Sequence, residues 1–321
     1  MFKTPLKWLG LTLALLALAG ALPEAQAQRA EGRITIVSPQ EPGSLLPHFD
    51  LLTLTHEVQR LAYDCLLTVD ETGALRPQLA VEVPSVANGG ISPDGTVYTF
   101  RLRPDVRWHD GGPLTSADVS VTVSVINDPD LPIPSRTVWD EIQSVETPDE
   151  RTVVVTFPAT NVAFLSTAST GSCFVLPRHL LEGTDIASSP LHRAPVGSGP
   201  FVVQAWTSGV GIELARNADY RDAGLPRLDA VSWRFIPATA AQRAALQRGD
   251  TDLQLDLTSA DLGFVQGLDG YRVVTSPFIA WWQFWVNNED PVLGDRRVRE
   301  ALVLALDRLA ITETVMGGVV Q

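Results

Sequence analysis

Along this chain, segments whose apolar residues recur at every second position, as on a strand, are interleaved with segments whose apolar residues have the spacing of a helix. This interleaving restricts the possible folds more than any other feature of the sequence. Over 96–103, Tyr98, Phe100 and Leu102 fall on one face of an expected strand, as apolar side chains do on a half-buried sheet. An expected helix follows the proline-containing loop 38–47, and its apolar stripe consists of Leu54, Val58, Leu61, Ala62 and Cys65. The mixture predicts an α/β fold with several hairpins rather than one parallel array of strands.

The same patterns predict most of the other elements. Further strands are expected at 33–37, 151–157, 200–206, 210–216, 231–235, 253–257, 271–275 and 281–286. Further helices are expected at 238–248, which Gly249 would end, and at 295–316.

Segment 116–126 fits both a strand and a helix. Its valines at alternate positions favour a strand, whereas Thr115 followed by Asp118 three residues later is typical of a helix N-terminus.

The composition is that of a folded protein with more than one domain. The 321 residues are 45% hydrophobic and 19% charged, which excludes an intrinsically disordered chain. The formal net charge is −13, and no cluster of Lys and Arg stands out. Nucleic acids and anionic membrane surfaces are bound through such clusters, so neither is expected as a partner.

The first 27 residues have the pattern of a secretory signal peptide. Two lysines precede an apolar run over 8–22, and 25–27 has the small-x-small pattern of a cleavage site. A membrane anchor would need roughly 20 apolar residues, more than this run supplies. No cysteine lies near the cleavage point, so a lipoprotein is not expected. The mature chain, starting near Gln28, is expected to be soluble, exported and periplasmic.

No motif for catalysis or metal binding stands out. None of the five histidines is spaced as one of a pair of metal ligands. Ser198 lies in a Gly-Ser-Gly-Pro run, but this run leads into a hairpin strand and not into the helix that a nucleophile elbow requires. Asp250, Asp252 and Asp256 lack the Gly and Glu of a calcium loop and are interpreted as a solvated strand edge. The sequence therefore predicts neither an enzyme nor a cofactor.

The two cysteines, Cys65 and Cys173, leave two interpretations open. An oxidising compartment permits a disulfide between them. Cys65 lies on the apolar face of the expected helix, so a buried free thiol is the alternative.

An aromatic cluster lies near the expected strand 281–286. It contains Trp281, Trp282, Phe284 and Trp285. On a strand, Trp282 and Phe284 share one face, and Trp281 and Trp285 share the other. Such a strand is either buried between two layers or forms part of a ligand-binding wall.

Three stretches in order carry a resemblance to a known family. They are 92–103 with 106–119, then 197–201 with Trp206, 212–220 and 226–229, and finally 295–302 with 305–308. With these motifs the chain resembles the family 5 solute-binding proteins, the oligopeptide-, dipeptide- and nickel-binding components of ABC importers. It departs from the family pattern at Ser198, where threonine is usual, and at Arg221, where an aromatic residue is usual.

The resemblance implies a periplasmic-binding-protein-like fold with two lobes and an extra inserted domain, and it implies a helix at 116–126. The expected division is a base lobe of 28–66 plus 195–277, an inserted domain of 67–194 and a second lobe that begins at 278. Relatives continue for roughly 200 residues beyond the Asp-Arg motif, well outside ordinary variation in domain size. The second lobe over 278–321 is therefore expected to be truncated and incomplete.

The resemblance also implies a function and a binding site. The chain would capture a peptide or similar small solute between its lobes, without converting it, and deliver it to the permease subunits of an ABC transporter. Glu41 to Ser44 and Trp281 to Phe284 would line the cleft, with Ser44 as a hydrogen-bonding group and Trp281, Trp282 and Phe284 as aromatic contacts.

Two alternatives remain. One is a non-functional fragment, in which the stripe of Val298, Leu302, Ala305 and Leu309 stays uncovered. The other is a secreted hydrolase, which would need a catalytic pair that the sequence does not show.

Overall fold

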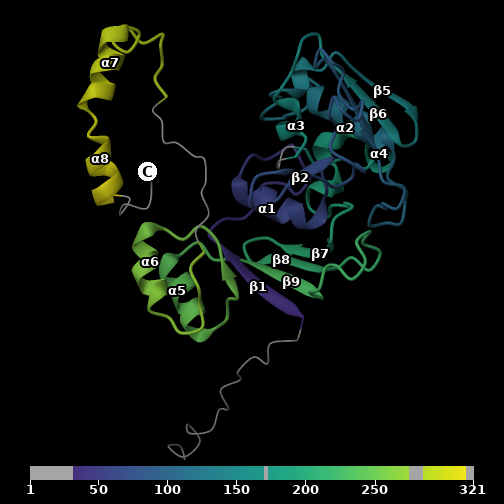
Figure 1. The fold of residues 1–321 in the computed structure, drawn as a ribbon. Helices are drawn as coiled ribbons and strands as arrows, with labels where there is room; N and C mark the ends of the chain where they lie inside the picture. Colours follow the sequence, from purple (N-terminus) through teal and green to yellow (C-terminus); the bar gives the residue numbers. More distant parts are fainter. Residues whose placement is uncertain (1–31, 170–172, 275–284, 316–321) are drawn as a thin grey trace, which may run out of the picture.

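The computed structural model describes residues 32–169, 173–274 and 285–315 (Figure 1). A five-stranded mixed sheet, called here the base sheet, has the strand order β10-β1-β9-β8-β7. Its strands are β1 (Arg33–Ser38), β7 (Phe201–Thr207), β8 (Gly211–Arg216), β9 (Ala230–Phe235) and β10 (Leu253–Gln254). β1 runs parallel to β9 and β10, and β8 runs antiparallel to β7 and β9. Distant segments of the chain therefore combine in one sheet.

The alternating residues of β9 form the centre of the base-sheet core. Val231, Trp233 and Phe235 are buried, together with Leu54 and Val58 of helix α1 (Thr53–Ala62), which covers one face of the sheet. Helix α5 (Thr239–Arg248) follows β9 and ends at Gly249, whose φ of 74° is a left-handed helix cap. The strand and helix patterns of this region are confirmed.

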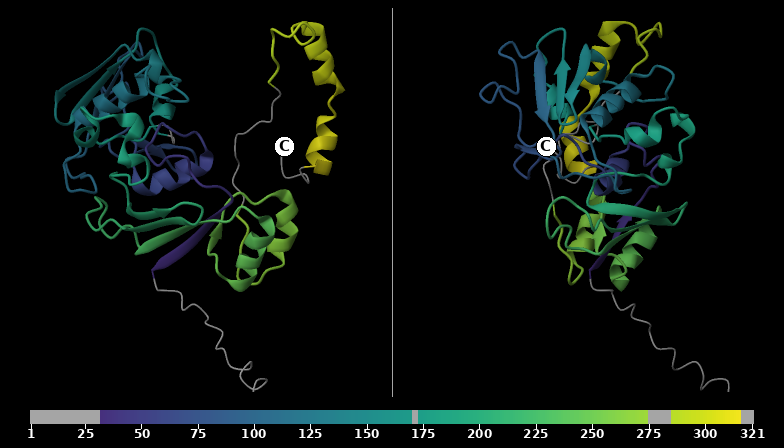
Figure 2. Two further views of the ribbon diagram at one scale, coloured as in Figure 1. Left: turned by 180° about the vertical axis from the view of Figure 1, so that it is seen from behind. Right: turned by 90° about the vertical axis from the view of Figure 1, so that its right-hand side faces the viewer.

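Segment 67–194 forms two further sheets. A hairpin pairs β2 (Leu67–Val69) with β3 (Leu75–Pro77), and an antiparallel sheet has the order β4-β6-β5. Its strands are β4 (Val97–Arg101), β5 (Ser144–Asp149) and β6 (Thr152–Thr156). Figure 2 shows this part of the chain on the opposite side of α1 from the base sheet.

Helix α2 (Ser116–Asn127) packs on β5 and β6. Thr115 and Asp118 form a capping box at its start, so the helix that the resemblance implied is confirmed and the strand alternative for this segment is wrong. The remaining elements of segment 67–194 are short: α3 (Phe164–Thr167), α4 (Arg178–Leu181), η1 (Trp139–Glu141), η2 (Ile186–Ser188) and η3 (Pro190–His192).

The Gly-Ser-Gly run crosses the end of α1 at very short range. A Cβ on Gly197 would lie 1.8 Å from the Ala62 carbonyl oxygen, and one on Gly199 would lie 2.6 Å from the Ala62 carbonyl carbon. Ser198 Oγ donates to Asp64 Oδ2 at 2.9 Å. His109 braces the same run, because its Nδ1 accepts from the Gly197 N–H and its Nε2 donates to the Gly199 carbonyl. The run is therefore a packing motif.

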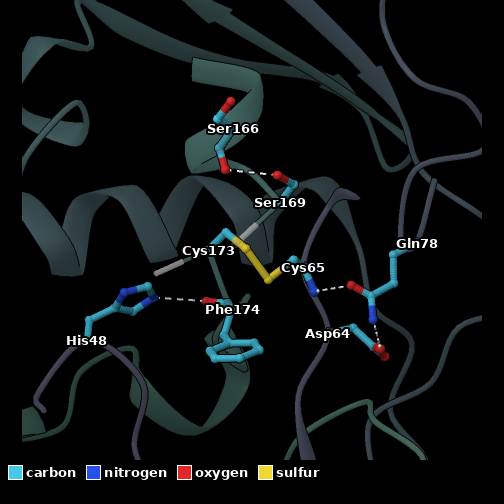
Figure 3. The surroundings of a disulfide bond; sticks show 8 residues. All are labelled: His48, Asp64, Cys65, Gln78, Ser166, Ser169, Cys173 and Phe174. Atoms are coloured by element: carbon cyan, nitrogen blue, oxygen red, sulfur yellow. Dashed lines mark hydrogen bonds between the residues drawn. A yellow bond between two sulfur atoms is a disulfide. The ribbon is translucent and has the colours of Figure 1, made fainter. Parts of the chain in front are cut away.

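Cys65 and Cys173 are joined in a disulfide with a Cα–Cα distance of 5.2 Å (Figure 3). Cys65 lies three residues beyond the last residue of α1, so the prediction that it belongs to the helix face was wrong. The helix ends at Ala62 because the chain turns into an extended conformation at Tyr63.

Three sequence predictions near the C-terminal end need correction, and one helix there was not predicted. β10 covers only Leu253–Gln254, and 271–274 contains no strand. An unpredicted helix, α6 (Ser259–Gln266), begins with a capping box of Thr258 and Asp261. The long helix 295–316 is broken into α7 (Arg296–Ala305), α8 (Arg308–Ala310) and the π-helix η4 (Ile311–Val315).

The predicted strand 281–286 lies partly outside the described residues, and its described part, Trp285 and Val286, is not in a strand. Within the described ranges, none of the helices has the length and apolar character needed to cross a membrane. The mixed α/β class is confirmed.

Candidate functional site

Glu41, in the loop after β1, is held by the β7–β8 hairpin. Its carboxylate accepts hydrogen bonds from Trp206 Nε1 at 2.7 Å, Ser208 Oγ at 3.0 Å and the Gly209 N–H at 2.8 Å. Arg193 lies 3.7 Å above the Trp206 ring and 3.5 Å from Glu41. Burial opposes ionisation of Glu41, but these donors and the Arg193 charge lower its pKa. Glu41 is therefore ionised and anchors the loop.

Ser44 is buried and fully engaged within the protein. Its Oγ lies 2.7 Å from His192 Nδ1 and also accepts from the Leu46 N–H at 3.0 Å. His192 Nε2 contacts the Ile186 carbonyl at 3.0 Å, so Nε2 is the donor there and Nδ1 accepts from Ser44. A direct hydrogen bond from the Ser44 hydroxyl to a ligand would require this arrangement to open.

The predicted aromatic wall lies outside the described residues. This holds for Trp281, Trp282 and Phe284. The neighbouring Trp285 is described and exposed. The structure therefore brings Glu41 and Ser44 into one loop and does not relate them to the three aromatic residues.

A cavity of about 290 Å³ lies next to this loop along the chain. Residues of 48–56 form one wall, residues of 135–139 form the other, and Thr167 completes it. The first wall leads into α1, and the second leads into η1. The walls are far apart in sequence and are brought together by the packing of segment 67–194 around α1.

Two residues of this cavity have a backbone conformation that is rare outside glycine. His48 has a φ of 76° and Val138 a φ of 72°. Histidine is tolerated in this region, but a β-branched residue is a genuine outlier there, and such strain costs about 1–3 kcal/mol. Strained residues that persist in a fold cluster at functional sites, so the pair draws attention to this cavity.

His48 is buried and held in one tautomer. Its Nε2 lies 2.9 Å from the Phe174 carbonyl, so Nε2 carries the proton and Nδ1 is an acceptor (Figure 3). Burial lowers the pKa of His48 to about 4, partly offset by that hydrogen bond. The ring is therefore neutral at pH 7.

Trp139 stands edge-on to His48, with ring centroids 6.5 Å apart. The residue is 4% exposed, and its indole N–H finds no hydrogen-bond partner in the part of the chain that is described. An unsatisfied buried donor of this kind costs about 1–3 kcal/mol of stability.

The charge on the cavity wall is negative. Asp50 accepts from the Leu52 N–H, Thr55 Oγ1 and the Gly43 N–H, and these bonds lower its pKa although burial opposes them. His56, in the same wall, has a lowered pKa because it is partly buried. No lysine or arginine lines the cavity among the residues described. Within the same ranges no group of His, Cys, Asp and Glu is arranged to hold a metal ion.

This cavity could not be predicted from the sequence. Its residues share no local motif. Val138 has a positive φ, which is rare for a β-branched residue and therefore could not be expected from the sequence. The prolines at 132 and 134 mark a loop there, but nothing in the sequence links that loop to His48.

The comparisons with known proteins give a consistent result. The model of the bacterial extracellular solute-binding proteins, family 5 Middle, matches residues 74–321. The chain is 27% identical over 331 residues to the oligopeptide-binding protein AppA of Bacillus subtilis, covering 98% of this chain and 59% of that protein. It is 30% identical over 315 residues to a putative ABC transporter peptide-binding protein of Brucella ovis, covering 96% and 58%.

The fold agrees with these matches. The structure of Bacillus subtilis AppA in complex with a nonapeptide superposes with a TM-score of 0.76 and 28% identity, over 89% of this chain and 56% of that one. The chain thus spans somewhat less than three fifths of the length of the relatives that it matches.

Proposed function

We propose, since this chain belongs to the bacterial extracellular solute-binding proteins of family 5, that it is the exported binding component of an ABC importer. It captures a peptide or a similar small solute and delivers it to the permease subunits at the membrane. The match of the family model over 74–321 carries this proposal. The peptide-binding names of the Bacillus and Brucella relatives support peptides as the ligand class. The signal pattern over 1–27 supports export and, with it, a periplasmic location.

We also propose that the chain divides into a base lobe of 28–66 plus 195–277, an inserted domain of 67–194 and the beginning of a second lobe from 278. The separation of the base sheet from the β2–β3 and β4-β6-β5 sheets supports this division. The crossing of Gly197 to Gly199 over Ala62 lies where the first two units would meet.

The ligand wall that we propose consists of the Glu41–Ser44 loop and the aromatic residues Trp281, Trp282 and Phe284. The anchoring of Glu41 by the β7–β8 hairpin and of Ser44 by His192 supports a preformed loop. A rigid loop loses little entropy when a ligand binds.

Titration calorimetry with a tripeptide library tests the function. A protein that includes both complete lobes is expected to bind saturably, and exchanging both Trp281 and Trp282 for Ala there should weaken binding by about tenfold or more, as truncation of aromatic anchors does. Trp285→Ala is the matched control, because this residue is exposed and lies outside the proposed wall. Absence of peptide binding would contradict the function, and unchanged affinity of the double variant would contradict the aromatic wall.

A further inference from the structure

We propose that Arg193 is a binding residue for a carboxylate group of the captured solute, at the edge of the base sheet where the Glu41–Ser44 loop lies. The inference rests on the proposed function for the nature of that solute, a peptide or a similar molecule. The site consists of the Arg193 guanidinium, the Trp206 ring that it lies over and the Glu41 carboxylate beside it.

This site lies at the carboxyl end of two parallel strands. β1 ends at Ser38, and β9, which pairs with it in parallel, ends opposite it at Phe235. Arg193 follows η3 and is tied to the loop after β1, because the Leu45 N–H donates to the carbonyl of the preceding residue, His192, at 2.9 Å. In open α/β sheets, ligands bind outside the carboxyl ends of the parallel strands. Arg193 therefore lies at an edge of the sheet where a ligand is expected.

Trp206 positions the guanidinium of Arg193. The guanidinium carbon lies 3.7 Å from the centroid of the Trp206 ring, well within the range of a cation–π interaction. The ring is itself held in place, because Trp206 Nε1 donates to the Glu41 carboxylate at 2.7 Å. The positive charge is therefore preorganised, and a ligand that binds it does not have to order a free side chain.

The hydrogen-bond donors of Arg193 are available to a ligand. Within the described part of the chain, the polar partner of the guanidinium is the Glu41 carboxylate, and the distance of 3.5 Å from Nη1 to Oε1 is longer than a normal N–H···O hydrogen bond. The Arg193 side chain is 49% exposed. A guanidinium has five donors in a planar fork that fits the two oxygens of a carboxylate. Arg193 can therefore pair with a ligand carboxylate without giving up an existing hydrogen bond.

Glu41 supports this site more than it competes for it. Its carboxylate accepts from Trp206 Nε1, Ser208 Oγ and the Gly209 N–H, so donors other than Arg193 stabilise its charge. Glu41 and a ligand carboxylate repel each other, but the Glu41 and Arg193 side chains are both partly exposed, so water weakens this repulsion. A neutral amide would avoid the repulsion, but it cannot form the bidentate charge-assisted pair, which decides for the carboxylate.

NMR of the Trp206 indole N–H signal in the 321-residue chain tests the proposal with two probes of one shape, N-acetylalanine and its amide. Trp206→Phe identifies the signal. N-acetylalanine is expected to shift it saturably and to bind about tenfold more tightly than the amide, the ratio that one charge-assisted hydrogen bond supplies. Arg193→Gln should abolish this preference, and Arg193→Lys, which keeps the charge but not the planar fork, should retain part of it.

The matched control is Arg234→Gln. The Arg234 side chain is 41% exposed and, like Arg193, lies beside a glutamate, with Glu213 at 2.8 Å. Trp206 aligns with Trp233 across β8, so Arg234, one residue further along β9, lies on the opposite face of the sheet. This variant should keep the full preference for N-acetylalanine.

Equal binding of the two probes would overturn the inference, and so would a preference that survives in Arg193→Gln or the absence of any response to N-acetylalanine. The probes do not need a complete second lobe. A selective response to N-acetylalanine, without tripeptide binding by a protein that includes both lobes, would therefore contradict the proposed function alone.

Paired tripeptides, bound to a protein that includes both lobes, identify the source of the carboxylate. Ala-Ala-Ala and its C-terminal amide test the terminal carboxylate, and the amides of Ala-Glu-Ala and Ala-Gln-Ala test an acidic side chain. The pair that contains the recognised carboxylate should differ about tenfold in affinity, and Arg193→Gln should reduce that ratio. If neither pair differs, Arg193 does not select a carboxylate.

Discussion

Arg221 Nη1 lies 2.5 Å from Asp64 Oδ2, and the two side chains are 4% and 0% exposed. Ser198 Oγ and Gln78 Nε2 also donate to Asp64, at 2.9 and 2.7 Å. Burial would lower the pKa of Arg221, but the Asp64 carboxylate beside it raises that pKa and keeps the guanidinium charged. The pair therefore joins segments that are far apart in the sequence through a buried network, in which Arg221 Nε is left without a hydrogen-bond partner among the described residues.

Removing the cation from this pair should be costly. Arg221→Met leaves the Asp64 carboxylate buried without its counter-ion, and the free energy of unfolding should fall by about 3–5 kcal/mol. The matched control is Arg248→Met, which breaks the exposed pair with Asp250 and should cost at most about 1 kcal/mol. Urea unfolding measures both. Equal losses in the two variants would contradict a special role for the buried pair.

Reduction of the Cys65–Cys173 disulfide should destabilise the protein by about 3–5 kcal/mol, because the bond closes a long loop in the unfolded chain. The two residues are 108 positions apart. Urea midpoints with and without dithiothreitol measure the effect. A variant with both cysteines exchanged for alanine is the control, and its midpoint should not respond to the reductant. If the urea midpoint of the wild-type protein is the same with and without the reductant, the disulfide does not contribute to stability.

His48 should make stability depend on pH. Its pKa is about 4 in the folded protein and 6.5 when unperturbed, so between these values the unfolded chain binds the proton more tightly. The His48 contribution is complete above pH 6.5 and is lost on acidification towards pH 4, by about 3 kcal/mol. His48→Asn, which tolerates the left-handed backbone, should reduce this slope in urea titrations at pH 4 to 7. An unchanged slope would assign the dependence to other groups.

The helices α7 and α8 should bind hydrophobic dyes in the 321-residue chain. None of the described side chains of α7 is buried, and Leu304 and Leu309 are 85% and 72% exposed. Exchanging both leucines for lysine should lower the fluorescence of a bound dye, with changes in unfolding free energy within about 0.5 kcal/mol, as for other surface sites. Val162→Lys, at a single exposed position elsewhere, should leave the dye signal unchanged. Dye binding that survives the leucine substitutions would place the apolar surface elsewhere.

Local patterns in the sequence predicted local structure well. Tyr98 and Phe100 lie buried on one face of β4, and Gly249 ends α5. Segment 116–126 was ambiguous from its residues alone, and the helix implied by the family resemblance is confirmed, with the capping box at Thr115 as its start. Thr258 and Asp261 have the same capping pattern at the start of α6, a helix that was not among the sequence predictions.

Predictions failed where a local signal was interrupted or where distant segments meet. The helical spacing of apolar residues predicted one helix over 295–316. Asp307 instead caps the start of α8 and so separates α8 from α7. The left-handed Val138 and the pairing of its wall with His48 depend on how segment 67–194 packs, which no short pattern records. The fold class could therefore be predicted from the sequence, whereas the cavity could not.

The chain leaves α1 at Ala62 and returns beside it at Gly197, so both ends of the intervening segment meet at one point. A segment attached in this way can lengthen, shorten or be exchanged without disturbing the strand register of the base sheet. The attachment point has no such freedom, because any side chain at Gly197 or Gly199 would collide with the last turn of α1. Among homologous chains, insertions and deletions should therefore accumulate between these two points, while the glycines that join them stay fixed.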